Sequence, residues 1–433
     1  MEEQGNKAPP STFINKVIFL FIGIASLLGW NALLTKLDFF DYFLSDIKPF
    51  RSFSFLNYFL NITFQFILIW KKNLIPLKAE LIGGIVGSII FLVLVPLSAS
   101  YLGQNEMINK VITALLVVLM GFINALASGG SFSYAGQFPL DMIVFFTVGQ
   151  GLSAILMNVL EYIVLASVHI KDEKKEYIVR AWIFFSVAIF ILVVCLFFLF
   201  YSYRNEYCKY YLNKADNTTS FSNKKEPVLL SVISPDENSE QEKDYKEQIK
   251  TINEEENEVK SEPTFLYVFK KIWYYDFLVC FIYIITFSLF PTVCIDQKIF
   301  KIGDYNSVTV ITIYNVFDTI GRYLVRFLKQ SSILNSIIIF GRSILLFTLI
   351  FNDYLQQNNT NETFTSIFLM VNVGILGLTN GIGATLTFGL ASDIAEDEIK
   401  KQTGGSMGFF CILGIFLGST LAFGTGAIID TFK

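Results

Sequence analysis

The residues best suited to bind a polar solute form one short stretch, Tyr314-Asn315-Val316-Phe317-Asp318-Thr319-Ile320-Gly321-Arg322. Asp318 and Arg322 are four positions apart, so on a helix they share one face about one turn from each other. Asn315 lies on nearly the same face. A carboxylate accepts hydroxyl protons and a guanidinium donates in a fork, so this face suits a solute rich in hydroxyl groups. The alternative is a self-neutralising ion pair that only makes the helix insertable in a membrane.

A second candidate site lies early in the chain, at Trp30 and Asn31 in the middle of an apolar run, with Leu34 one turn after Trp30. An indole surface for stacking next to an amide for hydrogen bonds suits a flat heterocycle. The alternative is a packed tryptophan whose N–H bonds a neighbouring helix.

Three further positions are candidates to line the same cavity. Phe290-Pro291 predicts a helix kink, and a proline frees a backbone carbonyl that can face a cavity. Asn124 and Ser128 are four residues apart and share a helix face. The alternatives are a plain kink at Pro291 and hydrogen bonds between helices at the two polar residues.

Two more acids lie within or beside apolar runs. We expect Asp141 to be a helix N-terminal acid, favoured by the helix dipole. Glu161 is a candidate proton site, but its place near the end of a run favours a side chain that extends to the membrane surface.

These groups belong to a chain of 433 residues that is 53% hydrophobic and only 16% charged, with a mean hydropathy of +0.53. Soluble domains carry about 25% charged residues, so we expect an all-α polytopic membrane protein. A net charge of −4 argues against nucleic-acid binding. One histidine, His169, and five scattered cysteines without a CxxC pair argue against metal sites, cofactors and an enzyme. The sequence has no GxxxxGK[ST] motif, so it does not indicate a nucleotide-driven pump.

A membrane-spanning helix needs about 20 mostly apolar residues, and the runs are too long and too unalternating for barrel strands. We predict eleven spans, with the break between the fourth and fifth at Gln137-Phe138-Pro139. The predicted spans lie near 14–35, 53–70, 80–102, 109–136, 139–168, 180–203, 270–294, 307–328, 332–352, 364–391 and 404–430.

One long polar segment, 204–263, divides the spans into six and five. It is acidic and rich in Asn, Ser and Lys, so we expect it to be largely disordered and cytoplasmic. The predicted domains are therefore a six-helix bundle over 1–203 and a five-helix bundle over 264–433. Two bundles around a central path are typical of transporters.

Basic residues between spans 2 and 3 and around Arg326 and Lys329 favour a cytoplasmic N-terminus under the positive-inside rule. Two Asn-x-Thr sequons, at Asn358 and Asn361, fit an extracellular loop after span 9. We expect an extracellular C-terminus and, as the default location, the plasma membrane.

Several motifs together resemble the equilibrative nucleoside transporter family, in a form similar to its protist members. The stretch ending in Asp318-Thr319-Ile320-Gly321-Arg322 is similar to the family's most specific signature. The other similar motifs are Gly29-Trp30-Asn31, Ala135-Gly136-Gln137-Phe138-Pro139, Gly149-Gln150-Gly151, Phe290-Pro291-Thr292-Val293, Thr379-Asn380-Gly381 and Gly408-Phe409-Phe410.

The resemblance implies a fold like the major facilitator superfamily and facilitated transport of nucleosides, with nucleobases as further substrates, by alternating access. It implies base contacts at Trp30 and Leu34 and ribose contacts at Asp318 and Arg322. The implied partners are a small-molecule nucleoside or nucleobase and the lipid bilayer, and we expect a monomer.

Two positions depart from the family pattern. Ser128 stands where the family commonly has a purine-binding Gln, so purine recognition would shift to Asn124 or become looser. Glu80 aligns near a position at the start of span 3 where the family has an arginine. Proton-coupled symport through Asp318, Glu161 or Glu80, and a membrane receptor that recruits partners through the acidic segment, remain alternatives.

Overall fold

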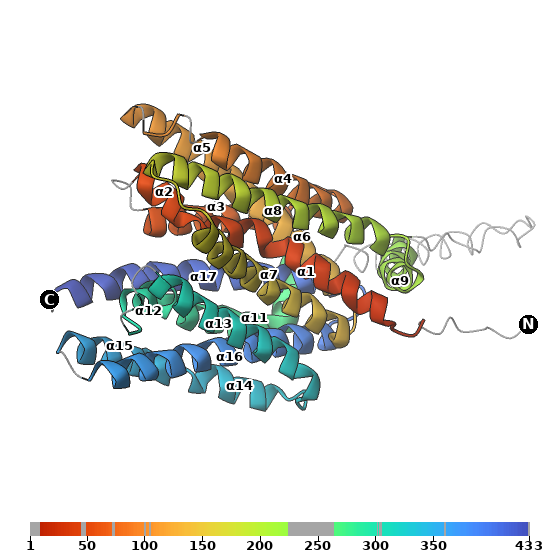
Figure 1. Cartoon of the computed structure of the whole chain (residues 1–433). Helices are drawn as coiled ribbons and strands as arrows, with labels where there is room; N and C mark the ends of the chain where they lie inside the picture. Colours follow the sequence, from red (N-terminus) through yellow and green to blue (C-terminus); the bar gives the residue numbers. More distant parts are fainter. Residues whose placement is uncertain are drawn as a thin grey trace, which may run out of the picture.

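The computed structural model describes residues 9–44, 49–71, 74–98, 101–103, 105–223, 264–300, 302, 305–358 and 361–431, and all regular structure in these ranges is helical (Figure 1). The helices of the first half are α1 (Phe13–Thr35), α2 (Leu37–Leu44), α3 (Pro49–Trp70), α4 (Leu77–Ser98), α5 (Glu106–Asn124), the π-helix η2 (Ala125–Gly129), α6 (Gly130–Ala135), α7 (Leu140–Ser167) and α8 (Glu173–Ser202). They are followed by α9 (Glu206–Asn223), α11 (Phe265–Leu289), α12 (Thr292–Asp296), α13 (Asn306–Leu324), the 3₁₀ helix η4 (Val325–Phe327), α14 (Ser332–Gly341), α15 (Ile344–Gln357), α16 (Glu362–Ile394) and α17 (Lys400–Thr431).

Every predicted span coincides with one helix or with two or three consecutive helical segments. Nine of the helical segments in the described ranges are long and apolar enough to cross a membrane. The predicted spans near 53–70 and 307–328 are α3 and α13, which fall short of that standard: only Phe55–Trp70 of α3 counts as a shorter apolar helix, and α13 carries several polar residues. The chain is thus an all-α multi-pass membrane protein, while the count of eleven spans remains a prediction.

Breaks within three spans were not fully predicted. The break at Gln137-Phe138-Pro139 is confirmed, because α6 ends at Ala135 and α7 begins after Pro139. At Phe290-Pro291 the chain does more than kink: α11 ends at Leu289 and a separate short helix, α12, follows. Spans 4 and 9 are each divided, the first by η2 and the second at Arg342 and Ser343.

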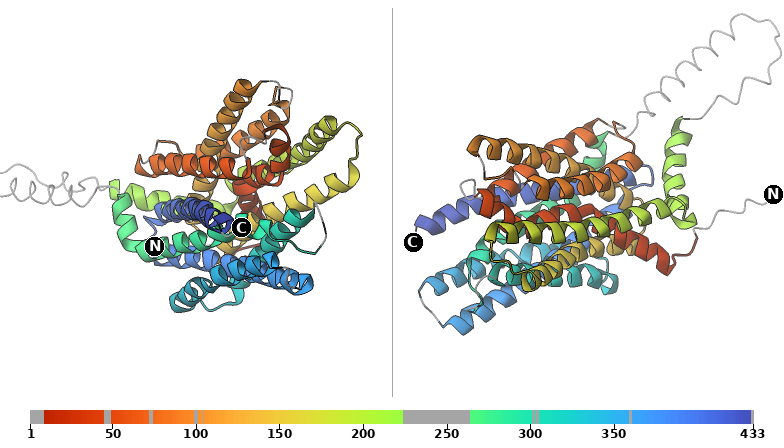
Figure 2. Two further views of the ribbon diagram at one scale, coloured as in Figure 1. Left: turned by 90° about the vertical axis from the view of Figure 1, so that its left-hand side faces the viewer. Right: turned by 45° about the horizontal axis from the view of Figure 1, so that its top comes forward.

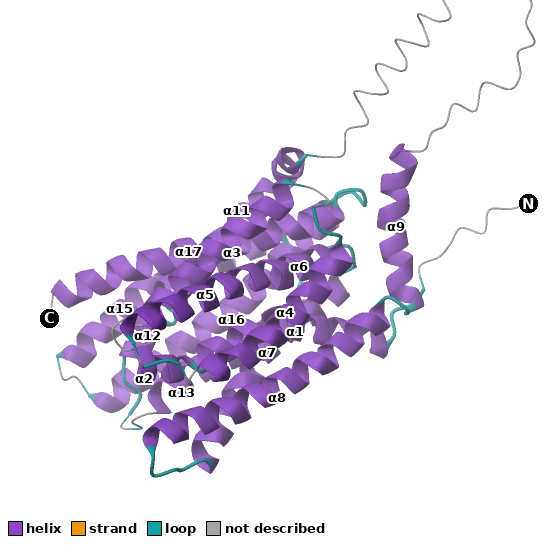
Figure 3. Cartoon of the chain, turned by 90° about the horizontal axis from the view of Figure 1, so that it is seen from above, coloured by secondary structure: helices purple, strands orange, loops and turns teal. Residues whose placement is uncertain are grey.

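Part of the segment expected to be disordered is helical. The helix α9 lies across the direction of the spans (Figure 3). The rings of Tyr207 and Tyr211 pack near Phe138, and Lys214 Nζ lies 2.7 Å from Asp397 Oδ2 in the connection before α17. Residues 224–263 of that segment lie outside the described residues.

The helices gather into two bundles, as the end-on view in Figure 2 shows. We call α1 to α8 the N-terminal bundle and α11 to α17 the C-terminal bundle. The end where α1 begins is called the α9 end, and the opposite end, where α17 finishes, is called the α2 end (Figures 1 and 3).

Glycines allow two helix pairs to approach closely, and these pairs carry most of the predicted site residues. A Cβ on Gly381 of α16 would overlap the carbonyl oxygen of Asp318 on α13, and one on Gly149 of α7 would overlap the carbonyl oxygen of Leu20 on α1. Without a hydrophobic drive between helices in lipid, such backbone contact is a main source of helix association.

The two bundles meet tightly at the α9 end. Asp141, in the first turn of α7, forms ion pairs with Lys16 at 3.1 Å and with Arg326 of the other bundle at 3.0 Å. Ser392 of α16 donates a hydrogen bond of 2.8 Å to the carbonyl of Gly136. Asp141 is therefore the helix N-terminal acid that the sequence predicted, and it also links the bundles.

Replacing Gly381 with alanine should lower stability, because the new Cβ forces α16 away from α13. We expect a loss of about 1–3 kcal/mol, the usual cost of overpacking, seen as a lower unfolding temperature in detergent. The matched control is Gly341→Ala, since a Cβ there meets no atom within 4 Å. Equal destabilisation by the two substitutions would contradict this account of the α13–α16 contact.

Candidate functional site

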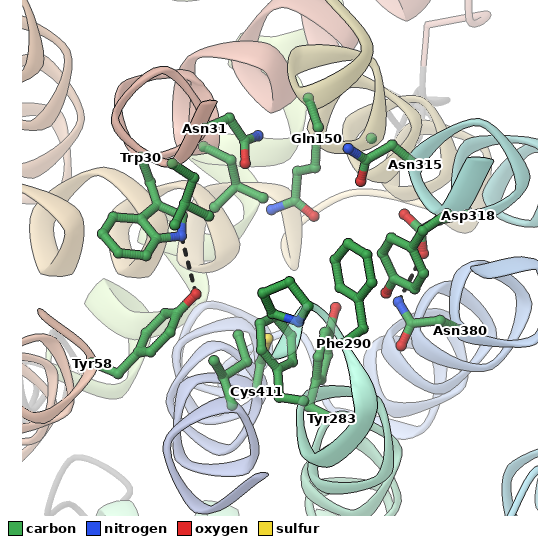
Figure 4. A pocket seen from close by; sticks show the side chains of 18 of the residues that line it. Trp30, Asn31, Tyr58, Gln150, Tyr283, Phe290, Asn315, Asp318, Asn380 and Cys411 are labelled. Carbon is green, nitrogen blue, oxygen red and sulfur yellow. Dashed lines mark hydrogen bonds between the residues drawn. The ribbon is translucent and has the colours of Figure 1, made fainter. Parts of the chain in front are cut away.

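A cavity of about 210 Å³ lies between the two bundles. Its walls come from α1, α3, α5, η2, α6, α7, α11, α12, α13, α16 and α17. All eight residues singled out from the sequence line it: Trp30, Asn31, Leu34, Asn124, Ser128, Phe290, Asp318 and Arg322. Figure 4 shows Trp30 and Tyr58 on one side of this space and Asp318 and Asn380 on the other.

Asp318 is the centre of a buried polar cluster. Its Oδ2 accepts a hydrogen bond of 2.7 Å from Arg322 Nε, as the four-residue spacing predicted. Its Oδ1 accepts a second bond of 2.7 Å from Asn380 Nδ2 on α16. Each carboxylate oxygen has a further lone pair, so Asp318 can still accept hydrogen bonds from a solute in the cavity.

Arg322 connects the two bundles. Its Nη1 donates to the backbone carbonyl of Thr147 and to Gln150 Oε1 on α7, both at 3.2 Å. Gln150 Nε2 in turn lies 3.3 Å from Ser26 Oγ on α1. Among the described residues no hydrogen bond of Arg322 uses Nη2, which leaves that group as a donor for a solute.

A second arginine bonds to this cluster from outside the cavity. Arg342, at the junction of α14 and α15, is only 3% exposed and does not line the cavity. Its Nη1 donates to Asn380 Oδ1 at 3.2 Å, and its Nη2 donates to the carbonyl of Leu376 at 3.1 Å. Asn380 is thereby held with its amide nitrogen toward Asp318. The sequence reasoning missed Arg342.

The aromatic side of the cavity is built on α1 and α3. Trp30 Nε1 donates a 3.0 Å hydrogen bond to the hydroxyl of Tyr58, and their rings meet edge to face with centroids 5.2 Å apart. Asn31 Nδ2 donates to Ser153 Oγ on α7 at 2.6 Å. The prediction that the N–H of Trp30 bonds a neighbouring helix is confirmed. Trp30 also lines the cavity, and stacking of a heterocycle on its indole stays a prediction.

Phe290 and Tyr314 form a second aromatic wall on the side of Asp318. Their rings are stacked, with centroids 4.1 Å apart and planes at 17°. The break between α11 and α12 places Phe290 and Pro291 on the cavity wall. The cavity therefore has aromatic surfaces on two sides and a charged, hydrogen-bonded group beside one of them.

Asn124 and Ser128 lie where α5 passes into the π-helix η2. Asn124 Nδ2 donates to Asn57 Oδ1 at 3.0 Å, and Ser128 Oγ accepts from Gln65 Nε2 at 2.9 Å. Both residues thus bond to α3 and also face the cavity. A π-helical turn rotates the residues that follow it relative to a regular helix, and such turns are frequent at functional sites.

The other two acids that the sequence analysis named as proton sites, Glu161 and Glu80, lie away from the cavity. The expectation that Glu161 extends to the membrane surface is wrong: it is 2% exposed, and its Oε1 lies 2.8 Å from the Nζ of Lys36, itself 1% exposed. Glu80, in the first turn of α4, does not line the cavity. A buried charge in a membrane needs a partner, and Lys36 supplies it for Glu161.

Sequence reasoning also missed the contribution of α3. Tyr58 and Asn61 line the cavity, and Asn57 and Gln65 lie behind it. The signal was present, because Asn57, Asn61 and Gln65 recur at every fourth position and so share one helix face.

Asp318→Asn should destabilise the folded protein, because it leaves the guanidinium of Arg322 buried without a counter-charge. We expect a loss of about 3–5 kcal/mol, as for other buried pairs broken on one side, measured as a lower unfolding temperature in detergent. Thr312→Val on the same helix is the control, since the Thr312 hydroxyl donates to the carbonyl of Val308 within its own helix. Unchanged stability of Asp318→Asn would show that the pair does not hold the cluster together.

Comparison with known structures identifies the fold. The chain resembles the fucose transporter FucP in its outward conformation, with a TM-score of 0.60 and 12% identity, over 97% of this chain and 92% of that one. It also resembles the proton:xylose symporter XylE, with a TM-score of 0.62 and 12% identity, over 97% and 89%. The fold is therefore that of the major facilitator superfamily.

Comparison with known sequences identifies the family. The chain is 24% identical to equilibrative nucleotide transporter 1 of Arabidopsis thaliana over 97% of this chain and 88% of the relative. It is 24% identical to human equilibrative nucleoside transporter 1, over 88% and 80%, and 22% identical to equilibrative nucleoside transporter 2 of Rattus norvegicus, over 97% and 98%. Residues 114–426 match the nucleoside transporter family. The chain belongs to the nucleoside transporter family and is a multi-pass membrane transport protein, not an enzyme.

Proposed function

We propose that this protein carries nucleosides, purine nucleosides in the first place, down their concentration gradient by alternating access, with nucleobases as further substrates. The observation that carries the proposal is the pairing of two features across one cavity. An aromatic pair, Trp30 and Tyr58, faces the buried carboxylate of Asp318 (Figure 4), which is bonded to the guanidinium of Arg322. A nucleoside has a flat base at one end and a ring of hydroxyl groups at the other.

The sugar end of the substrate fits the Asp318 cluster. The unused lone pairs of Asp318 can accept hydrogen bonds from two ribose hydroxyls, and Arg322 Nη2 can donate to one of their oxygens. Hydrogen bonds to charged groups contribute about 1.5–3 kcal/mol each, so this end would supply much of the affinity.

The base end fits between the aromatic surfaces. Stacking of a base on an aromatic side chain contributes about 1–3 kcal/mol and tolerates different bases. Leu34 lies one turn beyond Trp30 on the same cavity wall and would extend the apolar surface.

The same contacts provide a mechanism for transport. Arg322 belongs to the C-terminal bundle but bonds to Thr147 and Gln150 of the N-terminal bundle. A solute that competes for the Arg322 donors would change how the bundles are held together. Binding can move the equilibrium between two conformations only through such differential contacts. The bundles are joined at the α9 end by Asp141 and Arg326, so that contact must open for release on that side.

The orientation is part of the proposal. We place the α9 end in the cytoplasm and the protein in the plasma membrane. In support, Lys16, Arg326 and Lys400 all lie at the α9 end, whereas the sequon at Asn361 lies in the connection before α16, away from these cations.

The direct test is uptake of a labelled purine nucleoside by proteoliposomes, with and without an imposed pH gradient. We expect uptake that stops at equal concentrations and is unaffected by the gradient. Accumulation above equilibrium only with the gradient would establish a proton-coupled symporter instead. No uptake of any nucleoside or nucleobase by folded protein would overturn the proposal and favour a receptor.

Trp30→Ala should raise the KM for nucleosides by about tenfold, since stacking contributes about 1–3 kcal/mol. Trp30→Phe should retain most of the affinity, because it keeps an aromatic face and loses only the hydrogen bond to Tyr58. Trp273→Ala is the control, since Trp273 is 55% exposed on α11, outside the cavity. An unchanged KM in Trp30→Ala would contradict the proposal that the base stacks at this end of the cavity.

A further inference from the structure

A row of amide side chains on α3 has no role in the function described so far. Asn57, Asn61 and Gln65 are each no more than 2% exposed, although their side chains are polar. Asn57 and Gln65 are bonded to Asn124 and Ser128 on the neighbouring helices. Three polar residues of this group line the cavity: Asn61 of α3, Asn124 of α5 and Ser128 of η2. We call these three residues the amide ledge.

Asn61 is the member whose hydrogen-bonding capacity is unused. Its Oδ1 is buried without a partner, and no hydrogen bond within the described part of the chain uses its Nδ2. A buried amide left unbonded costs about 1–3 kcal/mol. An amide that faces a ligand cavity can recover this cost when a ligand supplies the missing bonds.

The other two members of the amide ledge offer mainly acceptors. Asn124 directs its Nδ2 to Asn57, which leaves Oδ1 as its free atom. The hydroxyl of Ser128 donates to the carbonyl of Asn124 at 2.6 Å and accepts from Gln65, so it offers only a remaining lone pair. The amide ledge therefore offers acceptors at Asn124 and Ser128 and a donor at Asn61 Nδ2, while Asn61 Oδ1 is a buried acceptor without a partner.

The amide ledge adjoins the aromatic pair. Asn61 follows Tyr58 by three residues on α3, so both lie on one helix face. Tyr58 is bonded to Trp30. A base stacked against Trp30 would therefore have one edge close to Asn61.

We propose that the amide ledge hydrogen-bonds the edge of the substrate's base, and that it selects bases that carry an exocyclic amino group. This inference rests on the proposed function. An amino group offers two donors to the acceptors of the amide ledge, and the ring nitrogen beside it can accept from Asn61 Nδ2. An amide side chain pairs with adjacent donor and acceptor atoms of adenine in this way. Asn57 and Gln65 are positioning residues, because they hold Asn124 and Ser128.

The test compares nucleosides that differ at this edge, as competitors of labelled adenosine uptake into proteoliposomes. The competitors are unlabelled adenosine, inosine, in which an oxo group replaces the amino group, and purine riboside, which lacks both. We expect inosine and purine riboside to compete about tenfold more weakly than adenosine, as for the loss of about 1.4 kcal/mol. In Asn61→Leu adenosine should compete more weakly than in the wild type, and the three should compete within about twofold of one another.

Thr63→Val is the matched control on the same helix, since Thr63 is exposed and its hydroxyl bonds the carbonyl of Phe59. It should keep the wild-type order of competitors. If Asn61→Leu does not fold, Asn124→Leu should reduce the same preference, and the wild-type order of competitors is itself a test.

Two results would overturn the inference while leaving nucleoside transport in place. One is a wild-type protein whose uptake of labelled adenosine is inhibited equally well by adenosine, inosine and purine riboside. The other is an Asn61→Leu protein that keeps the full preference for adenosine. Absence of uptake of every nucleoside would overturn both the inference and the proposed function.

Discussion

The buried guanidinium of Arg322 is the constraint on which the rest of the site depends. An unpaired charge inside a membrane protein is costly, so Arg322 requires a counter-charge and acceptors for its protons. Asp318 supplies the charge, and Thr147 and Gln150 supply acceptors from the other bundle. Since those acceptors belong to α7, satisfying one side chain also fixes how the two bundles meet.

The close helix contacts follow from the same requirement. Asn380 reaches Asp318 only because α16 lies against α13, with Gly381 at the carbonyl of Asp318. On the other side of the cavity, Gly149 lets α7 approach α1, which brings Gln150 within reach of both Ser26 and Arg322. Small residues and polar residues therefore act together: the first permit the approach, and the second bond across it.

The polar groups of the site divide into two kinds. Asp318 bonds both Asn380 and Arg322, and Arg322 bonds Gln150, so these groups form a continuous cluster, which favours a fixed geometry. Asn61 leaves its amide unbonded at the cavity wall. A site with a firm anchor at one end and unused hydrogen-bonding groups at the other can hold a class of solutes and still distinguish among its members.

The sequence by itself determined where the long apolar helices lie, the break before Pro139 and the Asp318–Arg322 pair. All three are local: apolar runs of membrane length, a proline that ends a helix, and a four-residue spacing that places two side chains together. Only the tertiary structure decided that Lys36 pairs with Glu161, that Arg342 supports Asn380, and that α3 contributes to the cavity wall. These partners are far apart in the sequence, and which helix faces meet depends on the packing of the whole bundle, which no spacing within one helix encodes.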